Sequence, residues 1–563
     1  MEHTTKKASW VSVVVSMGVL TLVSWLALQP LSRAGFFPMH DDTQVARVVV
    51  MSRAITQGQF PVRLVSDLGY GYGYPIYNFY GPLPYYVGAL FTHLGFSALE
   101  STKIMFAIGI LLLGWSTFAL VASFWGPLAG MTAGVLTQFA PYHAVQIYVR
   151  GAVGEFWASA FIPFVLLGFL LSGSVKTRRI GVRVGGVGLA FVILSHTVTG
   201  FATVVGCIIF ILGFAVYALM KREQRMRDVI GTYITTLLVG LGLTAFFWFP
   251  AVAEMQFTSV AGQIGATANY KDHFVCLAQF WNSPWGYGGS IPGCIDGVSF
   301  KLGKVHLAFG LLGFIFLYIS KRSVRTSLYW VGVLLIISGG MFATSISAPF
   351  WRVVPQLAYI QYPWRFITII ELGLAVLAGG LVLQKSRYVS GFVAICIVTL
   401  TLWNTVYLFA PQYSYPRDDA DFETPSDLRF RASKVSDEYL PSELIRPTQI
   451  ANVVFDTIES TGSAVVTKIR DDTTSAEYHV ISESSVDIRV NKAFFPGWKY
   501  WVNDEEVIPR IKHGLPELTL PAGKTVIVMR FVDTPVRTTG NIVTLVFILG
   551  LVLYYGKSKK TIT

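Results

Sequence analysis

Long apolar stretches alternate with short polar segments along most of the chain. Roughly twelve of these stretches are continuous enough to cross a bilayer as helices. They lie at about 9–28, 101–125, 127–141, 155–173, 182–196, 198–220, 229–250, 304–320, 327–346, 366–384, 388–410 and 538–556. The pattern therefore predicts a polytopic α-helical membrane protein with about twelve transmembrane helices.

The basic residues between these stretches indicate one orientation. A cytoplasmic N-terminus places every basic cluster on the cytoplasmic side, as positively charged loops prefer. The clusters are Lys6 and Lys7, 176–183, 221–227, 321–325, 385–387 and 557–560. The spans at 127–141 and 182–196 have the weakest signal, but losing only one of them would invert every later loop. Both are therefore kept. The first span is a retained helix, because it lacks the small-residue cleavage site of a signal peptide. Both termini are expected in the cytoplasm.

This orientation sends three longer segments to the outer face, at 30–100, 251–303 and 411–537. The last one alternates apolar and polar residues between the turn signals Pro496-Gly497 and Pro521-Ala522-Gly523, which is typical of β strands. We expect a transmembrane domain at 1–410, an extracytoplasmic β domain at 411–537, and a final helix with a basic tail at 538–563. Whether the β domain is a jelly roll or a sandwich stays open.

Composition agrees with a membrane protein. The chain is 53% hydrophobic and only 13% charged, with a mean hydropathy of +0.54, which excludes an ordinary soluble domain. The net charge of +12 would suggest nucleic-acid binding in a soluble protein. Here the basic residues lie in short segments between apolar spans, as orientation signals do, so we exclude nucleic acid as a partner.

Two of the four cysteines fall together on the outer face. Cys276 and Cys294 share the 251–303 segment, whereas Cys207 and Cys396 lie within predicted helices. An oxidising outer compartment would permit a disulfide between the first two. The spacing is equally compatible with two free thiols.

Ionisable residues near membrane depth are expensive unless they are paired, hydrated or functional. They are Arg150, Glu155, His196, Glu254, Arg365 and Glu371. Arg150 and Glu155 form either a binding site or a structural ion pair. Arg365 follows Trp364, so it is either a phosphate ligand, because arginine binds phosphate bidentately, or an interfacial side chain beside a tryptophan. His196 is either a ligand contact or a polar turn residue.

The first outer segment holds the most distinctive polar residues. Asp41 and Asp42 follow His40 just beyond the first span, before an amphipathic stretch at 43–57. One aspartate is suited to cap that helix. The other remains able to accept a proton or to bind a cation. The tyrosines that follow, which include Tyr72 and Tyr74, suit either sugar stacking or interfacial anchoring.

Several motifs carry a family resemblance. They are Met39-His40-Asp41-Asp42 with Arg47, Gly69-Tyr-Gly-Tyr-Gly-Tyr-Pro75, Tyr148-Val-Arg-Gly-Ala152 with Glu155, and Gln361-Tyr-Pro-Trp-Arg-Phe366. They resemble bacterial and archaeal membrane proteins labelled "6-pyruvoyl-tetrahydropterin synthase-related". Phe495-Pro-Gly-Trp498 and Leu520-Pro-Ala-Gly523 are similar to the outer β domain of YfhO-like proteins, and both groups resemble GT-C glycosyltransferases. Pterin chemistry is rejected, because the chain has no His-x-His pair.

The GT-C resemblance implies transfer of a sugar from a polyprenyl-phosphate donor to an extracytoplasmic glycan, lipid or protein acceptor. It implies that Asp41 or Asp42 is the catalytic carboxylate, acting as a base or orienting the acceptor. The residues expected to bind the donor phosphate or sugar are His40, Arg47, Tyr72, Tyr74, Arg150, Glu155, His196, Trp364 and Arg365. Some members of the superfamily use a divalent metal, for which His40 and Asp42 are the candidates here. A transporter or flippase, or a non-catalytic scaffold for lipid-linked envelope intermediates, remains the alternative.

Overall fold

The computed structural model describes residues 9–221, 224–263, 269–320 and 327–556. Three of the basic clusters that predict the orientation, Lys6 with Lys7, 321–325 and 557–560, lie outside the described residues. The cluster at 221–227 lies partly outside them. The orientation of the chain therefore stays a prediction.

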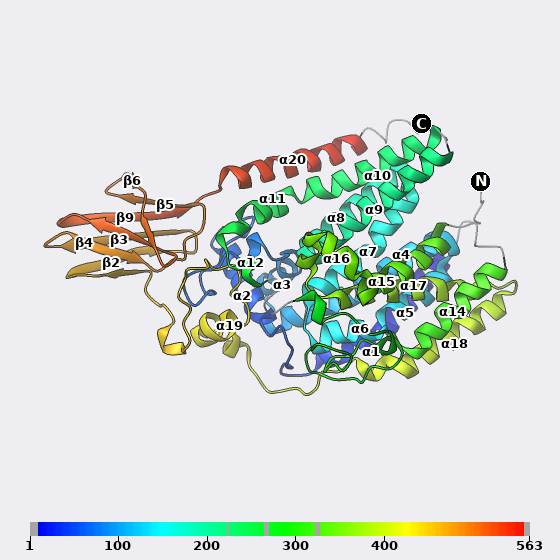
Figure 1. Ribbon diagram of the computed structural model, residues 1–563. Coiled ribbons are helices and arrows are strands. Elements are labelled where there is room, and N and C mark those ends of the chain that lie inside the picture. Colours follow the sequence, from blue (N-terminus) through cyan, green and yellow to red (C-terminus); the bar gives the residue numbers. More distant parts are fainter. Residues whose placement is uncertain (1–8, 222–223, 264–268, 321–326, 557–563) are drawn as a thin grey trace. The chain divides into compact units, whose positions relative to one another are not determined.

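All of the predicted spans are helical. The helices are α1 (Trp10–Leu28), α4 (Ala98–Trp125), α5 (Pro127–Gln138), α7 (Val153–Ser172), α8 (Arg178–Ser195), α9 (Thr197–Lys221), α10 (Gln224–Leu243), α14 (Lys304–Ile319), α15 (Ser327–Ala343), α17 (Ile367–Gly379), α18 (Arg387–Thr405) and α20 (Pro535–Gly556) (Figure 1). A multi-pass helical membrane protein is thus confirmed in its coarse form.

Fewer helices than the twelve predicted are long and apolar enough to be membrane spans. Within the described residues, 8 helical segments are long and apolar enough to cross a membrane, or 9 if α15 and the helix after it, bent by 78°, form one span. The others, α5, α8 and α14, have 12, 18 and 16 residues. Arginines open α8 and lower its hydropathy, while α5 and α14 are short for a bilayer about 30 Å thick.

Helix α8 is held by close packing on α7. A Cβ atom added to Gly168 of α7 would lie 2.1 Å from the Cα atom of Gly185 of α8, so the two backbones meet without side chains between them. Small residues at helix contacts allow this approach in membrane proteins. One of the two weakest predicted spans is therefore an integral part of the helix packing.

The described chain divides into two compact units. The first contains Met1–His40, Met105–Gly242 and Ile264–Pro416, and the second contains Asp41–Ile104, Leu243–Gln263 and Arg417–Thr563. The break after Pro416 lies near the predicted domain boundary at 410. The residues from 41 to 104, however, group with the β strands and α20 instead of with the other helices.

In the first unit a disulfide joins Cys276 and Cys294, which are separated by 18 positions. The segment around them packs on the helices through a cluster that includes Val275, Val298 and Phe300. Short helix α13 (Leu277–Trp281) begins directly after Cys276. The bond thus closes a loop whose two ends contact one hydrophobic core.

Replacing both Cys276 and Cys294 with serine is expected to destabilise the first unit by about 3 kcal/mol, because a crosslink of this loop length removes chain entropy from the unfolded state. Thermal unfolding in detergent, with and without reductant, measures the effect. The wild type should lose stability in reductant, and the double variant should not respond. The free Cys396, changed to alanine, is the control and should leave the response to reductant intact. A wild type that is insensitive to reductant would contradict the prediction.

The strands of the second unit begin later than the sequence predicted. Residues 411–457 form irregular chain and short helical turns such as η12 (Ser426–Ala432) and α19 (Ser433–Val435). Charged residues there form ion pairs within the segment, such as Arg417 with Asp427, and with other segments, such as Arg431 with Asp42. The strands are β1 (Ile458–Ser460), β2 (Ala464–Asp471), β3 (Ser475–Ser482), β4 (Val486–Val490), β5 (Trp498–Val502), β6 (Glu505–Val507), β7 (Arg510–Lys512), β8 (Leu515–Leu520) and β9 (Gly523–Phe531).

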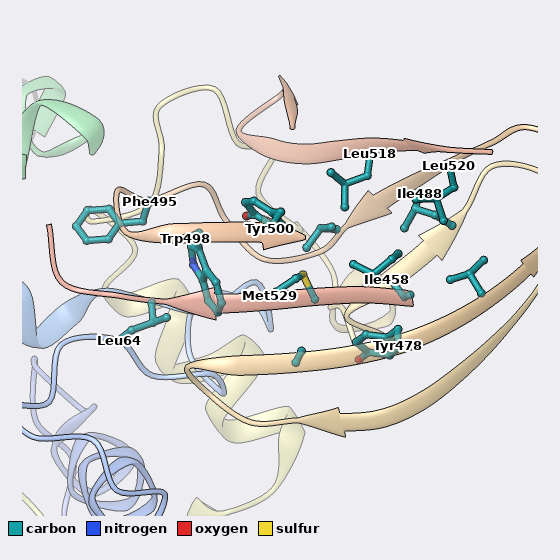
Figure 2. Close-up of a cluster of buried hydrophobic side chains, with 14 of the residues drawn as sticks. Leu64, Ile458, Tyr478, Ile488, Phe495, Trp498, Tyr500, Leu518, Leu520 and Met529 are labelled. Carbon is teal, nitrogen blue, oxygen red and sulfur yellow. The ribbon is translucent and has the colours of Figure 1, made fainter. Parts of the chain in front are cut away.

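These strands form two antiparallel sheets, ordered β1-β4-β8-β7 and β2-β3-β9-β5-β6. Alternate residues of both sheets, such as Ile488, Leu518, Tyr500 and Met529, point into one buried core (Figure 2). This is the face-to-face packing of a β sandwich. Leu64, from the 30–100 segment, packs into the same core, so the sandwich and that segment share one hydrophobic interior.

Candidate functional site

The candidate residues fall into two groups, one in each unit. His40, Arg150, Glu155, His196, Trp364 and Arg365 belong to the first unit, and Asp41, Asp42, Arg47, Tyr72 and Tyr74 to the second. The unit boundary falls between the neighbours His40 and Asp41.

Glu155 is the centre of the group in the first unit. It opens α7, where its carboxylate is only 3% exposed. Arg150 donates from Nη1 to both carboxylate oxygens at 3.0 Å, and Arg365 donates from Nε at 3.1 Å. One carboxylate between two guanidinium groups leaves a net charge of +1. The ion pair expected between Arg150 and Glu155 is present. Arg365 is a second cation on the same carboxylate, and the fixed net positive charge of the cluster attracts anions.

A second layer of polar residues, which sequence reasoning missed in part, supports this cluster. Tyr142 donates from its hydroxyl to Glu155 at 2.9 Å, and Gln146 donates from Nε2 at 3.0 Å. Both lie in the consecutive turns α6 (Pro141–Ala144) and η3 (Val145–Val149), which precede α7. The backbone N–H of Tyr142 donates to Glu371 of α17 at 2.9 Å. Glu371 thus fixes the turn that carries the Tyr142 hydroxyl.

Trp364 lies in a closed aromatic stack. Its ring stacks on Tyr362 at 4.2 Å and on Phe300 at 5.3 Å, and its side chain is 6% exposed. The expected role in sugar binding does not fit, because the ring is already covered by protein. Arg365 is also not an interfacial side chain, since its guanidinium bonds to Glu155 and donates to the Ile360 carbonyl at 2.7 Å.

His196 acts as a turn residue between α8 and α9. Its Nδ1 lies 2.8 Å from the Thr199 hydroxyl and accepts from the Thr199 backbone N–H at 3.2 Å. This contact caps the first turn of α9. The turn interpretation of His196 therefore fits the geometry better than a ligand contact.

Asp41 and Asp42 have different surroundings in the second unit. Asp42 accepts from Arg431 Nη1 at 2.7 Å, and Arg431 also pairs with Asp427. No hydrogen bond or ion pair to the Asp41 carboxylate is found in the part of its unit that the structure describes, although the charge of Arg47 acts on it. Of the two carboxylates, Asp41 is the one open to a ligand.

Neither aspartate caps the helix that follows. Helix α2 (Gln44–Thr56) begins after Thr43, and no side chain forms a capping hydrogen bond there. The expected N-cap is therefore wrong, because Asp42 bonds to Arg431 instead. Burial raises the pKa of the Asp42 carboxyl, with Arg431 and Arg417 acting in the opposite direction.

Arg47 is enclosed by tyrosines. It is 5% exposed, lies 4.2 Å over the Tyr80 ring, and donates to the Tyr85 hydroxyl at 3.3 Å and to Ser436 at 3.2 Å. A guanidinium so fully surrounded holds α2 to its neighbours. It is not placed as a ligand for a sugar phosphate, contrary to expectation.

The Gly-Tyr repeat at 69–75 forms a tight loop inside the second unit. Gly69, Gly71 and Gly73 have φ of 69°, 89° and 81°. Tyr74 is 0% exposed, so it has no face for a sugar and none for a membrane interface. The Tyr70 carbonyl accepts from Val454 at 3.0 Å, which joins the loop to the chain that leads into the sandwich.

Replacing Gly71 with alanine is expected to destabilise the second unit by about 1–3 kcal/mol, the range for strained backbone. A Cβ atom there would lie 2.2 Å from the Val454 carbonyl oxygen, in addition to the unfavourable φ. Gly58 has φ of 80° but nothing within 4 Å of an added Cβ, so Gly58→Ala is the matched control. The unfolding temperature should fall more for Gly71→Ala than for Gly58→Ala. Equal losses would show that the loop does not need this close contact.

The two candidate metal ligands, His40 and Asp42, already contact other protein groups. His40 places Nε2 3.0 Å from the Tyr287 carbonyl, and Asp42 bonds to Arg431. Among the residues with described side chains, no group of three His, Cys, Asp or Glu side chains is arranged to hold a metal ion. The donor set therefore does not fit the metal site suggested by the sequence.

No protein-family model matches the chain. An uncharacterized protein of Lactococcus lactis is 26% identical over 249 residues, which is 42% of this chain, and the chain spans 39% of that protein. The Archaeoglobus fulgidus oligosaccharyltransferase in its apo form matches at 14% identity over 81% of this chain and 62% of its own, with a TM-score of 0.44.

Two further solved structures are similar. The mycobacterial arabinofuranosyltransferase AftD matches at 15% identity over 71% of this chain and 27% of its own, with a TM-score of 0.42. ArnT from Cupriavidus metallidurans, bound to undecaprenyl phosphate, matches at 15% identity over 76% of this chain and 77% of its own, with a TM-score of 0.36. None of these likenesses assigns a role to a residue of this chain.

Proposed function

We propose that this multi-pass membrane protein is a glycosyltransferase of the GT-C type that transfers a sugar from a polyprenyl-phosphate donor to an extracytoplasmic acceptor. The observation that carries the proposal is the division of work between two adjacent carboxylates. Asp42 is bonded to Arg431, whereas the Asp41 carboxylate has no hydrogen bond or ion pair within the described residues of its unit. A fixed neighbour beside an open carboxylate suits a positioned general base.

The reaction assigned to these residues is a displacement at the anomeric carbon. Asp41 takes the proton of the acceptor hydroxyl while the hydroxyl oxygen bonds to the anomeric carbon. The bond from that carbon to the phosphate oxygen breaks. The polyprenyl phosphate leaves with the electron pair and gains negative charge at the phosphate. Stabilising that charge needs fixed positive groups. Within the first unit, the net positive cluster of Arg150, Glu155 and Arg365 is suited to binding an anionic group.

The exposure of the two arginines supports their assignment. The side chains of Arg150 and Arg365 are 11% and 13% exposed, whereas Glu155 between them is 3% exposed. The carboxylate thus orients the two cations and is itself the least accessible member. We assign Glu155 as a positioning residue and the two arginines as phosphate ligands.

The experiment is sugar transfer by the purified protein in lipid, with a panel of radiolabelled polyprenyl-phosphate sugars and a mixture of envelope acceptors. Turnover of any donor that requires the wild-type protein supports the proposal. Donor moved across sealed vesicles without covalent transfer would replace it with a transporter or flippase. Donor that is neither transferred, moved nor bound would leave a scaffold as the remaining function.

A further inference from the structure

A groove lies on the second unit at the outer face of the four-stranded sheet. It has a volume of about 310 Å³ and is lined by Tyr72, Leu444, Arg489, Lys512, His513 and Glu517, among others. Its lining comes from strands β4, β7 and β8, the turn between β7 and β8, the 69–75 loop and the chain before the sandwich. Its volume is at the low end of the range for small-molecule sites, about 300–1,000 Å³.

The groove is held open by backbone contacts. The turn between β7 and β8 places His513 and Gly514 at φ of 50° and 74°, as a tight hairpin requires. The Gly514 carbonyl accepts from Phe494 at 2.8 Å, and an added Cβ at Gly514 would lie 3.3 Å from the backbone nitrogen of Leu444. The Tyr72 carbonyl accepts from Ala493 at 2.7 Å. The turn and the 69–75 loop are therefore both bonded to the chain between β4 and β5.

Charges on the sheet face are arranged in a row. Glu459, Arg489, Glu517 and Arg510 are direct partners on the successive strands β1, β4, β8 and β7. Alternating charges of this kind are usual on a solvated sheet face. At the groove, Arg489 pairs with Glu459, whereas Lys512 and Arg510 share Glu517 at 3.6 and 2.7 Å. Two cations on one carboxylate leave one positive charge in excess.

The groove also presents apolar surface beside these charges. The Tyr72 side chain is half-buried, and Arg489 is near enough to oppose the effect of burial, which raises the pKa of the Tyr72 hydroxyl. Ile445, another lining residue, is 70% exposed. An aromatic ring and an exposed aliphatic side chain next to cations suit a ligand with apolar ring faces and a negative charge.

We propose that this groove binds an acidic saccharide, a sugar that carries a carboxylate or a phosphate group. Arg489 and Lys512 bind the anionic group, and Tyr72 lies against the sugar ring. In the proposed transferase the groove holds an acidic glycan acceptor, and that role rests on the proposed function. The binding itself does not, because it needs no donor and no chemistry.

The test is direct binding to the full-length protein in lipid nanodiscs by titration calorimetry. The probes are an oligogalacturonate for the carboxylate, a glycerol-phosphate oligomer for the phosphate, and a malto-oligosaccharide as the neutral comparison. At least one acidic probe should bind, and the neutral one should bind about tenfold more weakly, since each contact to a charged group is strong. Which acidic probe binds identifies the anionic group.

Variants locate the binding. Arg489→Ala and Lys512→Ala should each lower the affinity for the acidic probe by about tenfold. Tyr72→Leu should also lower this affinity, whereas Tyr72→Phe should leave it unchanged. Lys499→Ala is the matched control, because Lys499 is a half-exposed lysine paired with Glu506 in the other sheet. Its affinity should equal that of the wild type.

The proposal is overturned if no acidic probe binds, if neutral and acidic probes bind equally, or if Lys499→Ala loses as much affinity as Lys512→Ala. Thermal unfolding of each variant separates lost affinity from lost folding. If Lys512→Ala unfolds, Lys512→Gln takes its place, because it removes the charge and keeps most of the side chain. Binding of an acidic probe by a protein without transferase activity would leave the groove established and the proposed function refuted.

Discussion

Replacing Asp41 with asparagine is expected to lower sugar transfer by about a hundredfold to ten-thousandfold, the contribution of a general base, while the protein stays folded. The substitution removes the proton-accepting group but keeps the size of the side chain. Because no hydrogen bond or ion pair of the described fold ends on the Asp41 carboxylate, thermal unfolding should not change measurably. The measurement is the transfer rate with the donor that the wild type uses.

Asp42→Asn is the matched comparison for Asp41→Asn. An asparagine at this position can still accept from Arg431, but the ion pair is lost, while the pair of Arg431 with Asp427 stays. We expect a lower unfolding temperature and at most a small loss of transfer. Full transfer by Asp41→Asn with none by a folded Asp42→Asn would reverse the two roles. The raised pKa of the Asp42 carboxyl would then be the property of the working base.

Helix positions were readable from the sequence because apolar length is a local property. Each stretch of about twenty apolar residues identifies a helix regardless of its partners. The case of α8 marks the limit, since its arginines lower the local signal and its position depends on the contact between Gly168 and Gly185. The sandwich strands were readable from period-two alternation. The irregular chain at 411–457 has the same polarity without that period, so it was assigned to the β domain.

The roles of individual charged residues were less readable, because their partners are distant in sequence. Arg431, the partner of Asp42, is 389 positions away in a segment with no motif. The Gly-Tyr repeat suggested exposed aromatic rings, yet positive φ at its glycines folds Tyr74 into the interior. Spacing predicted only the local contact between Arg150 and Glu155, which are 5 positions apart.

Glu254 shows the same limit and leads to the second large effect. It ends α11 (Ala245–Glu254), and its carboxylate accepts from Arg537 Nε at 3.1 Å and Nη2 at 3.0 Å. Arg537, 0% exposed, lies in the first turns of α20, and it also donates to the Pro496 carbonyl at 2.7 Å. Asn78 and Thr534 donate to the same carboxylate at 2.9 and 2.7 Å. One buried ion pair thus connects two helices and the loop between β4 and β5 within the second unit.

Replacing Glu254 with alanine is expected to destabilise the second unit by about 3–5 kcal/mol, because it leaves the Arg537 guanidinium buried without its counter-charge. Arg537→Ala should cost a similar amount by leaving the carboxylate unpaired. A double variant, Glu254→Gln with Arg537→Met, removes both charges and should recover part of the loss, since the cost comes from the unpaired charge more than from the missing attraction.

The matched control is the exposed pair of Lys499 and Glu506, whose side chains are 46% and 53% exposed. Lys499→Ala should change stability by less than about 1 kcal/mol, because water screens such pairs. The measurement is unfolding of each variant in detergent, followed by tryptophan fluorescence. If Glu254→Ala unfolds no more easily than Lys499→Ala, the buried pair does not hold α11 to α20. If the double variant is less stable than either single variant, the loss of the attraction itself, and not the unpaired charge, causes most of the destabilisation.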